Sequence, residues 1–579
     1  MNNNKLPELL APCGSMEALE AALAGGADAV YLGGTMFNAR MNAKNFDRAE
    51  LTEAVKKCHG VGARIYVTFN TLVYDREMKS ALEYAKFLYE AGVDALIIAD
   101  IGLATLIRKY FPDFEIHAST QAVAHNADSV RKLAQIGFSR VVCARELNAS
   151  DIESMINAGD TEIEMFVHGA MCVSCSGECL MSAMLGGRSG NRGECAQPCR
   201  MPYNGSYPLS LKDMCLASHI PEIIEMGVAS LKIEGRMKSP SYVYGVTSIY
   251  RKLLDERRAA SPAESAELAK IFSRGGFTDG YFTGKVDDTM LGIRSEKNIN
   301  DSRSTSQKIP PINKRLPEIT VSDRKAELPK GAGSFARGSA LDGKVINSGR
   351  FVKLSQIPQT NFFDHIYVPI SCFAGKATNT QTKPDGVVFP TVIYESELDK
   401  TKFMLDNAVK NGIKHALIGN IGHLDLARDF GLIPHGDYKL NITNSTSAVF
   451  YADMGLDSIL LSPELILPQL RDVTIGDKPT VKGVVAYGRL PLMHLRRLTG
   501  LRELRDNRNT RFPVILDGKN ETVYNSVPTY MADQLNRLDD AGIRERHFIF
   551  STEDRNEVLR AIYAYQHKVI PKDPVRRIK

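Results

Sequence analysis

Short apolar segments alternate with longer amphipathic ones through the first half of this 579-residue chain. The strand-like segments are 8–14, 29–34, 64–70, 95–100, 115–120, 140–145, 163–169 and 229–235. Between most of them lie helical patterns such as SMEALEAALAGGAD and ADSVRKLAQIGF. Strands that alternate with helices indicate an α/β fold with a parallel sheet, and eight such units predict a TIM-like (β/α)8 barrel. A doubly wound sheet is disfavoured because no GxGxxG motif follows the first strand.

A change of composition divides the chain. Residues 296–345 are rich in Ser, Arg, Lys, Pro and Gly, which is typical of a linker or a small insert. After them the alternation resumes, with eight further strand candidates at 364–370, 386–394, 415–420, 438–443, 458–463, 481–488, 512–517 and 547–551. We therefore expect a barrel in residues 1–295 and a second barrel-like domain in 346–579.

Two local matches indicate that the second half is a duplicate of the first. LAQIGFSRVVCAREL (133–147) aligns with YADMGLDSILLSPEL (451–465), and EMFVHGAMCV (164–173) aligns with GVVAYGRLPL (483–492). The offset along the chain is nearly the same in both matches, which favours duplication over chance. Because the second copy lacks cysteine at the corresponding positions, we expect a degenerate barrel that serves as scaffold or binding surface.

The composition is that of a globular protein, with 44% hydrophobic and 24% charged residues. The N-terminal sequence MNNNKLPELLAPCG has no basic-then-apolar signal pattern, and no apolar run approaches the ~18 residues of a membrane span. We therefore expect a cytoplasmic protein without a membrane partner. In that reducing compartment, clustered cysteines bind metal or perform chemistry more often than they form disulfides.

Five of the ten cysteines fall between positions 172 and 199, in the long loop that joins the seventh and eighth predicted strands. This loop is rich in Gly, Ser, Arg and Asn, so it offers little apolar core for a buried thiol. Four thiolates can hold zinc or an iron–sulfur cluster, and the spacing alone leaves both open. The spacing is Cys172-x6-Cys179-x15-Cys195-x3-Cys199, with Cys175 and Cys215 as extras.

The cysteine loop, FVHGAMCVSCSGECLMSAMLGGRSGNRGECAQPCRMPY (166–203), and SLKIEGRMKSPSYV (230–243) resemble the signature of the U32, or collagenase-like, peptidase family. ELLAPCGSMEALEAALAGGADAVYLGG and FNAR are similar to the first strands of that family. The resemblance therefore covers roughly residues 6–285. In the second half, YGRLPLM and YNSVPTYMADQL resemble the C-terminal region of the longer bacterial members.

The resemblance carries functional implications. Family members include proteins needed for hydroxylation of tRNA, of 23S rRNA and, without oxygen, of ubiquinone precursors. It implies a 4Fe–4S cluster on Cys172, Cys179, Cys195 and Cys199, with Cys175 as a departure from the pattern and a possible substitute ligand. It also implies an oxygen-independent RNA hydroxylase with prephenate or a similar dicarboxylate as hydroxyl donor, and an electron donor as a further partner. The linker is shorter than the insert expected in the rRNA members.

Three arginines of the cysteine loop are candidate binding residues: Arg188, Arg192 and Arg200. They could balance the negative charge of cluster thiolates. They could equally bind a dicarboxylate, because guanidinium groups form bidentate pairs with carboxylates. The alternative is three solvated arginines on a surface loop.

A second group of candidates follows the eighth predicted strand, where barrels often bind anions. Lys232, Arg236 and Lys238 could contact a carboxylate or an RNA phosphate, and Tyr242 could stack on a base. Glu234 could hold one of these cations or move a proton. The alternative is a barrel rim held by salt bridges.

His168 ends the seventh predicted strand and could relay a proton or donate to a cluster sulfur, although a structural histidine fits equally. With Glu234 and Arg236 it completes the set of candidate catalytic residues.

Two other functions stay open. One is a peptidase, although HExxH and GxSxG are absent. The other is a non-catalytic maturation factor that binds RNA or protein and uses metal for structure. A basic run at 494–511 favours an RNA-facing surface.

Overall fold

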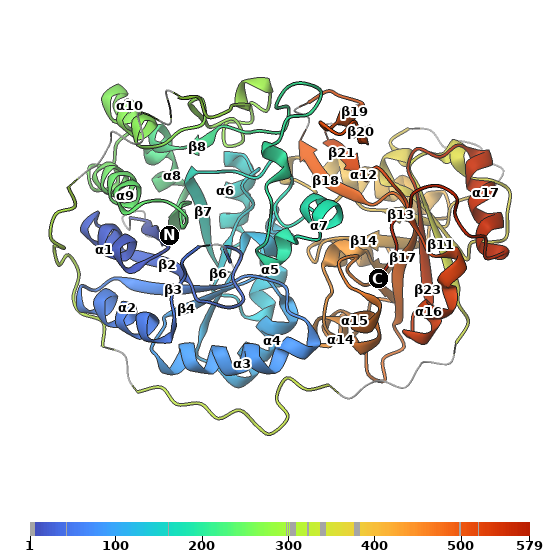
Figure 1. Ribbon diagram of the computed structural model, residues 1–579, viewed down its shortest axis with the longest axis horizontal. Coiled ribbons are helices and arrows are strands. Elements are labelled where there is room, and N and C mark those ends of the chain that lie inside the picture. Colours follow the sequence, from blue (N-terminus) through green and yellow to red (C-terminus); the bar gives the residue numbers. More distant parts are fainter. Residues whose placement is uncertain are drawn as a thin grey trace.

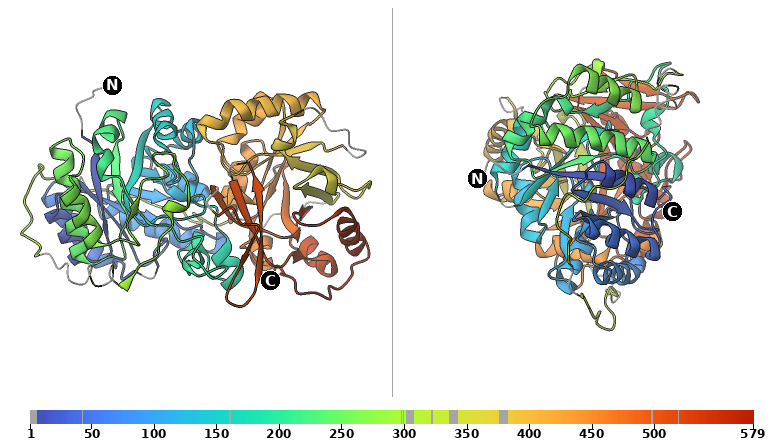
Figure 2. Two further views of the ribbon diagram at one scale, coloured as in Figure 1. Left: turned by 90° about the horizontal axis from the view of Figure 1, so that it is seen from above. Right: turned by 90° about the vertical axis from the view of Figure 1, so that its left-hand side faces the viewer.

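Two barrels lie side by side in the computed structural model, blue to green and yellow to red in Figure 1, and the view from above agrees (Figure 2). The structure describes residues 6–41, 43–159, 161–296, 298, 300, 308–320, 323–335, 343–375, 383–496, 499–518 and 520–579. Each barrel is a closed sheet of eight parallel strands with alternating helices. The predicted α/β architecture of two TIM-like barrels is confirmed.

The first barrel contains all eight predicted strands. They are β1 (Glu8–Cys13), β2 (Ala29–Gly33), β3 (Arg64–Phe69), β4 (Ala95–Ile98), β5 (Glu115–Ala118), β6 (Arg140–Val142), β7 (Glu162–Gly169) and β9 (Ser230–Ile233). Because β9 pairs in parallel with both β1 and β7, the sheet closes. Two short strands, β8 (Asp213–Cys215) and β10 (Phe277–Thr278), extend the edge beside β7.

Helices cover the outside of the first barrel. They are α1 (Met16–Ala24), α2 (Arg48–Gly60), α3 (Asp75–Glu90), α4 (Ile101–Tyr110), α5 (Ala127–Ile136), α6 (Ala149–Asn157), α8 (Ile220–Met226), α9 (Pro240–Asp255) and α10 (Pro262–Ile271). Several begin where a polar side chain accepts the first free backbone N–H groups, as Ser15 and Asp47 do. Among the residues that the structure describes, none of the helices has the length and apolar character needed to span a bilayer.

The second barrel repeats this order. Its strands are β11 (Ile346–Phe351), β12 (His365–Pro369), β13 (Gly386–Val388), β14 (His415–Ile418), β15 (Ile433–Gly436), β16 (Ser458–Leu460), β17 (Val481–Gly488) and β23 (Glu545–Phe550), with β23 closing onto β11 and β17. The helices are α12 (Leu398–Lys410), α13 (His423–Asp429), α14 (Ser445–Asp453), α15 (Leu467–Asp472), α16 (Leu535–Asp540) and α17 (Arg555–Gln566).

Three strand assignments in this half need correction. The first strand, β11, has the polar sequence INSGRF and was not predicted. The predicted strand 438–443 is wrong: β15 ends at Gly436, and a 3₁₀ turn follows at Tyr438–Leu440. The segment 512–517 is a strand, but it belongs to a separate antiparallel sheet of β18 (Pro491–Arg496), β19 (Glu503–Arg505), β20 (Arg511–Asp517) and β21 (Asn520–Tyr524).

Within the segment predicted as a linker or insert, 296–345, the described stretches 308–320 and 323–335 run along the outside of the first barrel as the yellow-green trace of Figure 1. These stretches form neither helix nor strand. They are fastened to the barrel by side chains: Arg315 lies 3.3 Å from Asp255, and Arg324 donates to the carbonyl oxygen of Val93 at 2.9 Å.

The two barrels meet through equivalent elements. Helix α4 packs against α14, and α5 packs against α13. The Asn444 side chain caps α14 and donates to the Asp100 carboxylate at 2.7 Å, while Asn126 caps α5 and donates to the carbonyl oxygen of Ile393 at 2.9 Å. Asn126 and Asn444 are themselves a matched pair, because their offset is that of the first sequence match. The interface therefore resembles an isologous contact between two copies.

Candidate active site at the mouth of the first barrel

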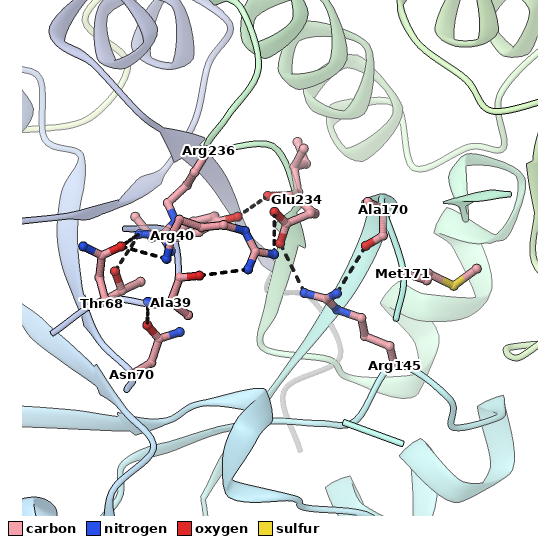
Figure 3. A network of polar contacts seen from close by, with 12 residues as sticks. Ala39, Arg40, Thr68, Asn70, Arg145, Ala170, Met171, Glu234 and Arg236 are labelled. Atoms are coloured by element: carbon pink, nitrogen blue, oxygen red, sulfur yellow. Dashed lines mark hydrogen bonds and ion pairs between the residues drawn. The ribbon is translucent and has the colours of Figure 1, made fainter. Parts of the chain in front are cut away.

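Three arginines surround one glutamate at the C-terminal end of the first barrel (Figure 3). Glu234 directly follows β9, Arg145 lies just beyond β6, and Arg40 belongs to the loop after β2. Arg40 Nη2 lies 3.4 Å from Glu234 Oε1, and Arg145 Nη2 lies 3.2 Å from Glu234 Oε2. The two carboxylate oxygens thus hold two guanidinium groups that come from different strands.

Arg236 completes this group from inside the barrel. Its Nη1 donates to Thr68 Oγ1 at 2.8 Å and to Asn38 Oδ1 at 3.4 Å. The guanidinium passes directly over Gly33, where a Cβ atom would lie 2.4 Å from Nη1. Glycine at this position is therefore a steric requirement for the placement of Arg236.

The charges of the group fix the protonation of Glu234. Burial alone would raise the pKa of its carboxyl, but Arg40, Arg145 and Arg236 outweigh burial and hold the pKa at about 2. Burial and the neighbouring Arg40 lower the pKa of Arg236 to about 10. At neutral pH the carboxylate is ionised and the arginines are charged. This state suits Glu234 to hold cations rather than to act as a general acid.

The cysteine loop lies beside this mouth. Its first carbonyl groups receive hydrogen bonds from arginines: Arg145 donates to Ala170 at 3.2 Å, and Arg200 donates to Met171 at 3.0 Å. Further along, Gly193 has a φ of +82° and sits against Asn38, so that a Cβ atom would lie 2.4 Å from the Asn38 carbonyl oxygen. The loop is therefore packed on the segment that presents Arg40.

Four cysteines of the loop form one electrostatic group. Cys172, Cys195 and Cys199 lie close enough to Cys179 that their negative charge, when they are ionised, raises the pKa of its thiol. Burial raises the pKa of Cys179, and burial raises that of Cys199 to about 11 despite the adjacent Arg200. The structure thus brings together the four cysteines that the family resemblance selects.

Cys175 lies elsewhere. It is buried, its backbone N–H donates to the carbonyl oxygen of His494 at 2.7 Å, and it lines a cavity over the second barrel. In that setting its thiol neighbours Glu146, Glu178 and Tyr394 rather than the other loop cysteines. Its role as a substitute ligand receives no support from this position.

The thiol sulfurs of the loop are not gathered as closely as a bound zinc ion would hold them. Tetrahedral zinc with Zn–S bonds of about 2.3 Å places its sulfurs about 3.8 Å apart. Within the part of the chain that the structure describes, no three thiol sulfurs lie within 4.8 Å of one another. The backbone N–H of Gln197 donates to Cys195 Sγ at 3.3 Å, the kind of hydrogen bond that tunes a cluster sulfur.

The three predicted loop arginines have different surroundings. Arg192 forms an ion pair with Glu77 at 2.7 Å and ties the loop to α3, so its guanidinium is already paired in this structure. Arg200 stays next to Cys199 while it donates to the carbonyl oxygens of Leu211 and Met171. Arg188 is exposed on the surface of the loop.

Two residues that were predicted to contact a ligand, Lys232 and Tyr242, have partners within the barrel instead. The Lys232 ammonium is buried inside the barrel, 2.7 Å from Glu164. The Tyr242 hydroxyl donates to the backbone carbonyl of Glu234 at 2.9 Å, and its buried ring has no free face for a base. Lys238 lies over the Phe272 ring, and burial lowers its pKa to about 7.

His168 is 1% exposed and packs among the rings of Tyr242, Tyr250 and Phe277. Its Nδ1 lies 3.4 Å from the Tyr250 hydroxyl oxygen, and burial lowers its pKa to about 3. A register shift in the pairing of β7 with β9 falls between Phe166 and His168. This is the setting of a structural histidine, which the sequence left as the alternative to a proton relay.

Arg40 and Arg145 were not among the site residues selected from the sequence. Both carried a signal, because Arg145 stands at the end of the sixth predicted strand and Arg40 belongs to the FNAR motif. Only the fold shows that the two reach the same carboxylate.

The sequence pattern of peptidase family U32 matches residues 14–291 and 376–496, which include the mouth residues and the cysteine loop. The chain belongs to this family. Over 322 residues it is 42% identical to the tRNA hydroxylation protein P1 of Bacillus subtilis (strain 168), covering 51% of this chain and 76% of that protein.

Two further relatives carry different names. The chain is 40% identical over 294 residues to the 23S rRNA 5-hydroxycytidine C2501 synthase of Escherichia coli (strain K12), covering 49% of this chain but only 44% of that protein. It is 34% identical over 319 residues to a collagenase of Porphyromonas gingivalis (strain ATCC BAA-308 / W83), covering 49% of this chain and 75% of that protein.

Proposed function

We propose that this chain hydroxylates RNA, a tRNA or 23S rRNA, at the mouth of its first barrel in the cytoplasm. The observation that carries the proposal is the juxtaposition of four cysteines with three arginines and one glutamate at the end of the barrel where active sites lie. Relatives at 40% and 42% identity are named for hydroxylation of 23S rRNA and tRNA, which supports this choice of reaction.

In this proposal Cys172, Cys179, Cys195 and Cys199 hold a 4Fe–4S cluster. The donor set fits, since iron–sulfur clusters are held by four thiolates, and the backbone N–H of Gln197 donates to Cys195 Sγ at 3.3 Å. When bound, the cluster supplies a redox centre or Lewis acid at the barrel mouth, with electrons from a separate donor. Arg200, beside Cys199, offsets part of its negative charge.

Arg40, Arg145 and Arg236 would bind prephenate or a similar dicarboxylate as the hydroxyl donor. The three guanidinium groups face a single carboxylate, Glu234, so two positive charges are left for a dianion. Arg40 is the outermost, with a side chain 34% exposed, while the Arg145 side chain is 11% exposed. Glu234 would hold Arg40 and Arg145 in place for bidentate pairing with the ligand.

The RNA would lie across the cysteine loop and the antiparallel sheet β18–β21. The sheet is bound to the loop: Leu180 N–H donates to the Leu492 carbonyl at 2.8 Å, and Asn204 N–H donates to the Arg505 carbonyl at 2.9 Å. Exposed arginines gather on this sheet next to the loop, namely Arg502, Arg505, Arg508 and Arg511. Such a row suits the phosphate backbone, and its contribution should fall with added salt.

The test is nucleoside analysis of total tRNA and rRNA from a deletion strain that carries wild-type, Cys195→Ala or Cys175→Ala protein. We expect the deletion to lose one hydroxylated nucleoside. Wild-type and Cys175→Ala protein should restore it and Cys195→Ala should not, because only Cys195 belongs to the proposed ligand set. Iron and sulfide analysis after anaerobic purification should show about four of each per chain, lost in Cys195→Ala.

Two outcomes would contradict the proposal. A deletion strain that keeps every RNA nucleoside would remove the reaction. Peptide cleavage that survives loss of the cluster would instead favour the peptidase hypothesis, which the collagenase relative keeps as the competing function.

A further inference from the structure

Two histidines and an aspartate converge at the N-terminal end of the second barrel, away from the strand ends that form its mouth. His365 is the first residue of β12, Asp385 directly precedes β13, and His415 is the first residue of β14. One ligand atom from each lies within 4.8 Å of the other two. The side chains are 22%, 36% and 15% exposed, so they are partly buried yet open to solvent.

The distances around Asp385 fit a bridging cation. Its Oδ1 accepts the Ile366 backbone N–H at 2.6 Å, which orients the carboxylate. Its Oδ2 lies 2.9 Å from His365 Nδ1 and 3.9 Å from His415 Nε2. Metal bonds of about 2.0–2.2 Å to nitrogen and oxygen place neighbouring ligand atoms about 3–4 Å apart. The second distance is too long for a hydrogen bond but suits two ligands of one ion.

A chain of hydrogen bonds sets the tautomer of His415. The Ser458 hydroxyl faces the Glu545 carboxylate and donates to it, so its oxygen accepts from His435 Nδ1 at 2.9 Å. His435 Nε2 is then bare and accepts from His415 Nδ1 at 2.9 Å. With this tautomer the Nε2 of His415 turns its lone pair toward Asp385, and a cation between the two acceptors would satisfy both. Metal-bound histidines are oriented through their second nitrogen in this way.

The first barrel places small residues at the matching strand positions. The first residues of its second and fourth strands are Ala29 and Ala95, where the second barrel has His365 and His415. At the third position of the fifth strand both barrels have a histidine, His117 in the first and His435 in the second. The two ligand imidazoles are therefore particular to the second barrel.

We propose that His365, Asp385 and His415 bind one divalent transition-metal ion of the zinc and iron(II) class. Imidazole and carboxylate donors suit these ions, and three protein ligands leave a position for water. Binding would release the proton that His365 shares with Asp385. The ion would link three consecutive strands, β12, β13 and β14, and so stabilise the second barrel.

The test is a Co²⁺ titration of the full chain, purified anaerobically and freed of loosely bound metal with a chelator. Co²⁺ gives visible ligand-field bands, and thiolate ligands add charge-transfer bands in the near ultraviolet. We expect one Co²⁺ per chain without thiolate bands, displaced by Zn²⁺ or by Fe²⁺ in separate titrations. His365→Gln and His415→Gln should each weaken binding at least 100-fold.

Two control variants test whether the Co²⁺ signal comes from the cysteine loop or from a histidine outside the proposed site. Cys195→Ala should leave this Co²⁺ signal unchanged. His219→Gln should also leave it unchanged, because His219 contacts two carboxylates, Glu222 and Asp279, without a second imidazole. Melting in chelator should be the same for wild-type and both ligand variants, which shows that they fold.

A positioning variant sharpens the test. His435→Gln removes the group that orients His415 without removing a ligand, and loss of such an outer partner typically costs 10–100-fold in metal affinity. The proposal is overturned if the double variant His365→Gln/His415→Gln binds Co²⁺ as tightly as the wild type. It is equally overturned if all bound Co²⁺ shows thiolate bands, or if Zn²⁺ raises the melting temperature of wild type and double variant alike.

Discussion

The two barrels share one frame but use the same position for different purposes. Strands β7 and β17 are the pair that the second sequence match aligns, and in each the pairing register shifts near the end of the strand. After β7 the chain forms the cysteine loop, whereas after β17 it forms the antiparallel sheet β18–β21. That sheet holds the loop, since Leu492 and His494 accept backbone hydrogen bonds from Leu180 and Cys175. One copy thus carries the candidate chemistry and the other supports it.

The mouths of the two barrels differ in the same sense. In the second, Arg350 at the end of β11 is paired with Asp437 at 3.1 Å, below a cavity of about 680 Å³ that is also lined by Lys439 and Cys175. In the first, three arginines share one carboxylate beside four cysteines. A duplicated frame therefore does not imply a duplicated site.

The most direct test of this difference between the barrels is to remove one arginine from each mouth. The Arg145 and Arg350 side chains are 11% and 12% exposed and each is paired with a carboxylate, so they form a matched pair. Arg145→Gln should lower formation of the hydroxylated nucleoside about 100-fold, because truncating a buried charge pair costs about 2–5 kcal/mol. Arg350→Gln should stay within about twofold. Equal losses would place the second mouth in the reaction.

The bottoms of the barrels allow a second test, of stability. In the first barrel the fully buried Glu164 lies 2.7 Å from Lys232 and 3.3 Å from Arg140. In the second, the buried Glu545 accepts from the neutral Ser348 hydroxyl at 2.5 Å. Glu164→Gln should lower the free energy of unfolding by about 3–5 kcal/mol because it leaves buried cations unpaired. Glu545→Gln, which loses only hydrogen bonding, should cost about 1 kcal/mol.

Urea unfolding followed by circular dichroism at several pH values measures both effects. Burial opposes ionisation of Glu164, but Lys232 and Arg140 prevail and lower its pKa from 4.5 to about 2. Its contribution is therefore fully present above pH 4.5 and is lost as the pH falls toward 2. A difference between wild type and Glu164→Gln that does not shrink over this range would contradict the ion-pair explanation.

The interface offers a smaller effect. Asn444→Ala removes the cap on Ser447 N–H and the donor to the buried Asp100 carboxylate, whereas Asn126→Ala removes the cap on Ser129 N–H and a donor to a neutral carbonyl. Each should cost about 1–2 kcal/mol, with Asn444→Ala the larger, since a charged acceptor loses more. Thermal melting measures both, and a neutral result for either would show that the interface is not symmetric.

The sequence predicted the first barrel almost completely, because its strands are apolar and its helices begin at strong caps such as Ser15 and Asp47. The strand prediction was less accurate in the second barrel, where the local sequence does not reflect the pairing that the fold imposes. INSGRF is typical of a turn, yet β11 is a strand because β12 and β23 pair with it on both sides. An apolar strand at 512–517 could not be assigned to its sheet from the sequence, because partner choice is set by tertiary packing.

The candidate site was predicted in part. Family resemblance selected Cys172, Cys179, Cys195 and Cys199, which the structure groups together. The arginines could not be sorted in this way, because an ion pair depends on a partner from another strand or helix. Arg192 forms an ion pair with Glu77, and Arg145 forms one with Glu234. In both pairs the partner is far away in the sequence.

The smallest expected effect separates two buried histidines. Burial lowers the pKa of His168 and of His547 to about 3, but their neighbours differ. His168 lies among aromatic rings, with its Nδ1 3.4 Å from the Tyr250 hydroxyl oxygen, whereas His547 Nδ1 lies 2.8 Å from Ser348 Oγ. His168→Phe should therefore change stability at pH 7 by less than about 1 kcal/mol. His547→Phe should cost about 0.5–1.5 kcal/mol, because it removes the hydrogen bond between the imidazole and Ser348 Oγ, whose hydroxyl still donates to Glu545.

The pH dependence of His168→Phe decides the role of His168. Below pH 6.5 His168 binds a proton in the unfolded chain but stays neutral in the folded one. Wild-type His168 therefore destabilises the fold increasingly as the pH falls from 6.5 toward 3. His168→Phe should lose less stability than wild type over that range, measured by urea midpoints at pH 7 and pH 5. It should also keep nucleoside formation near the wild-type level. Loss of the nucleoside in a stably folded His168→Phe protein would return His168 to the reaction as a proton relay and extend the active site behind β7.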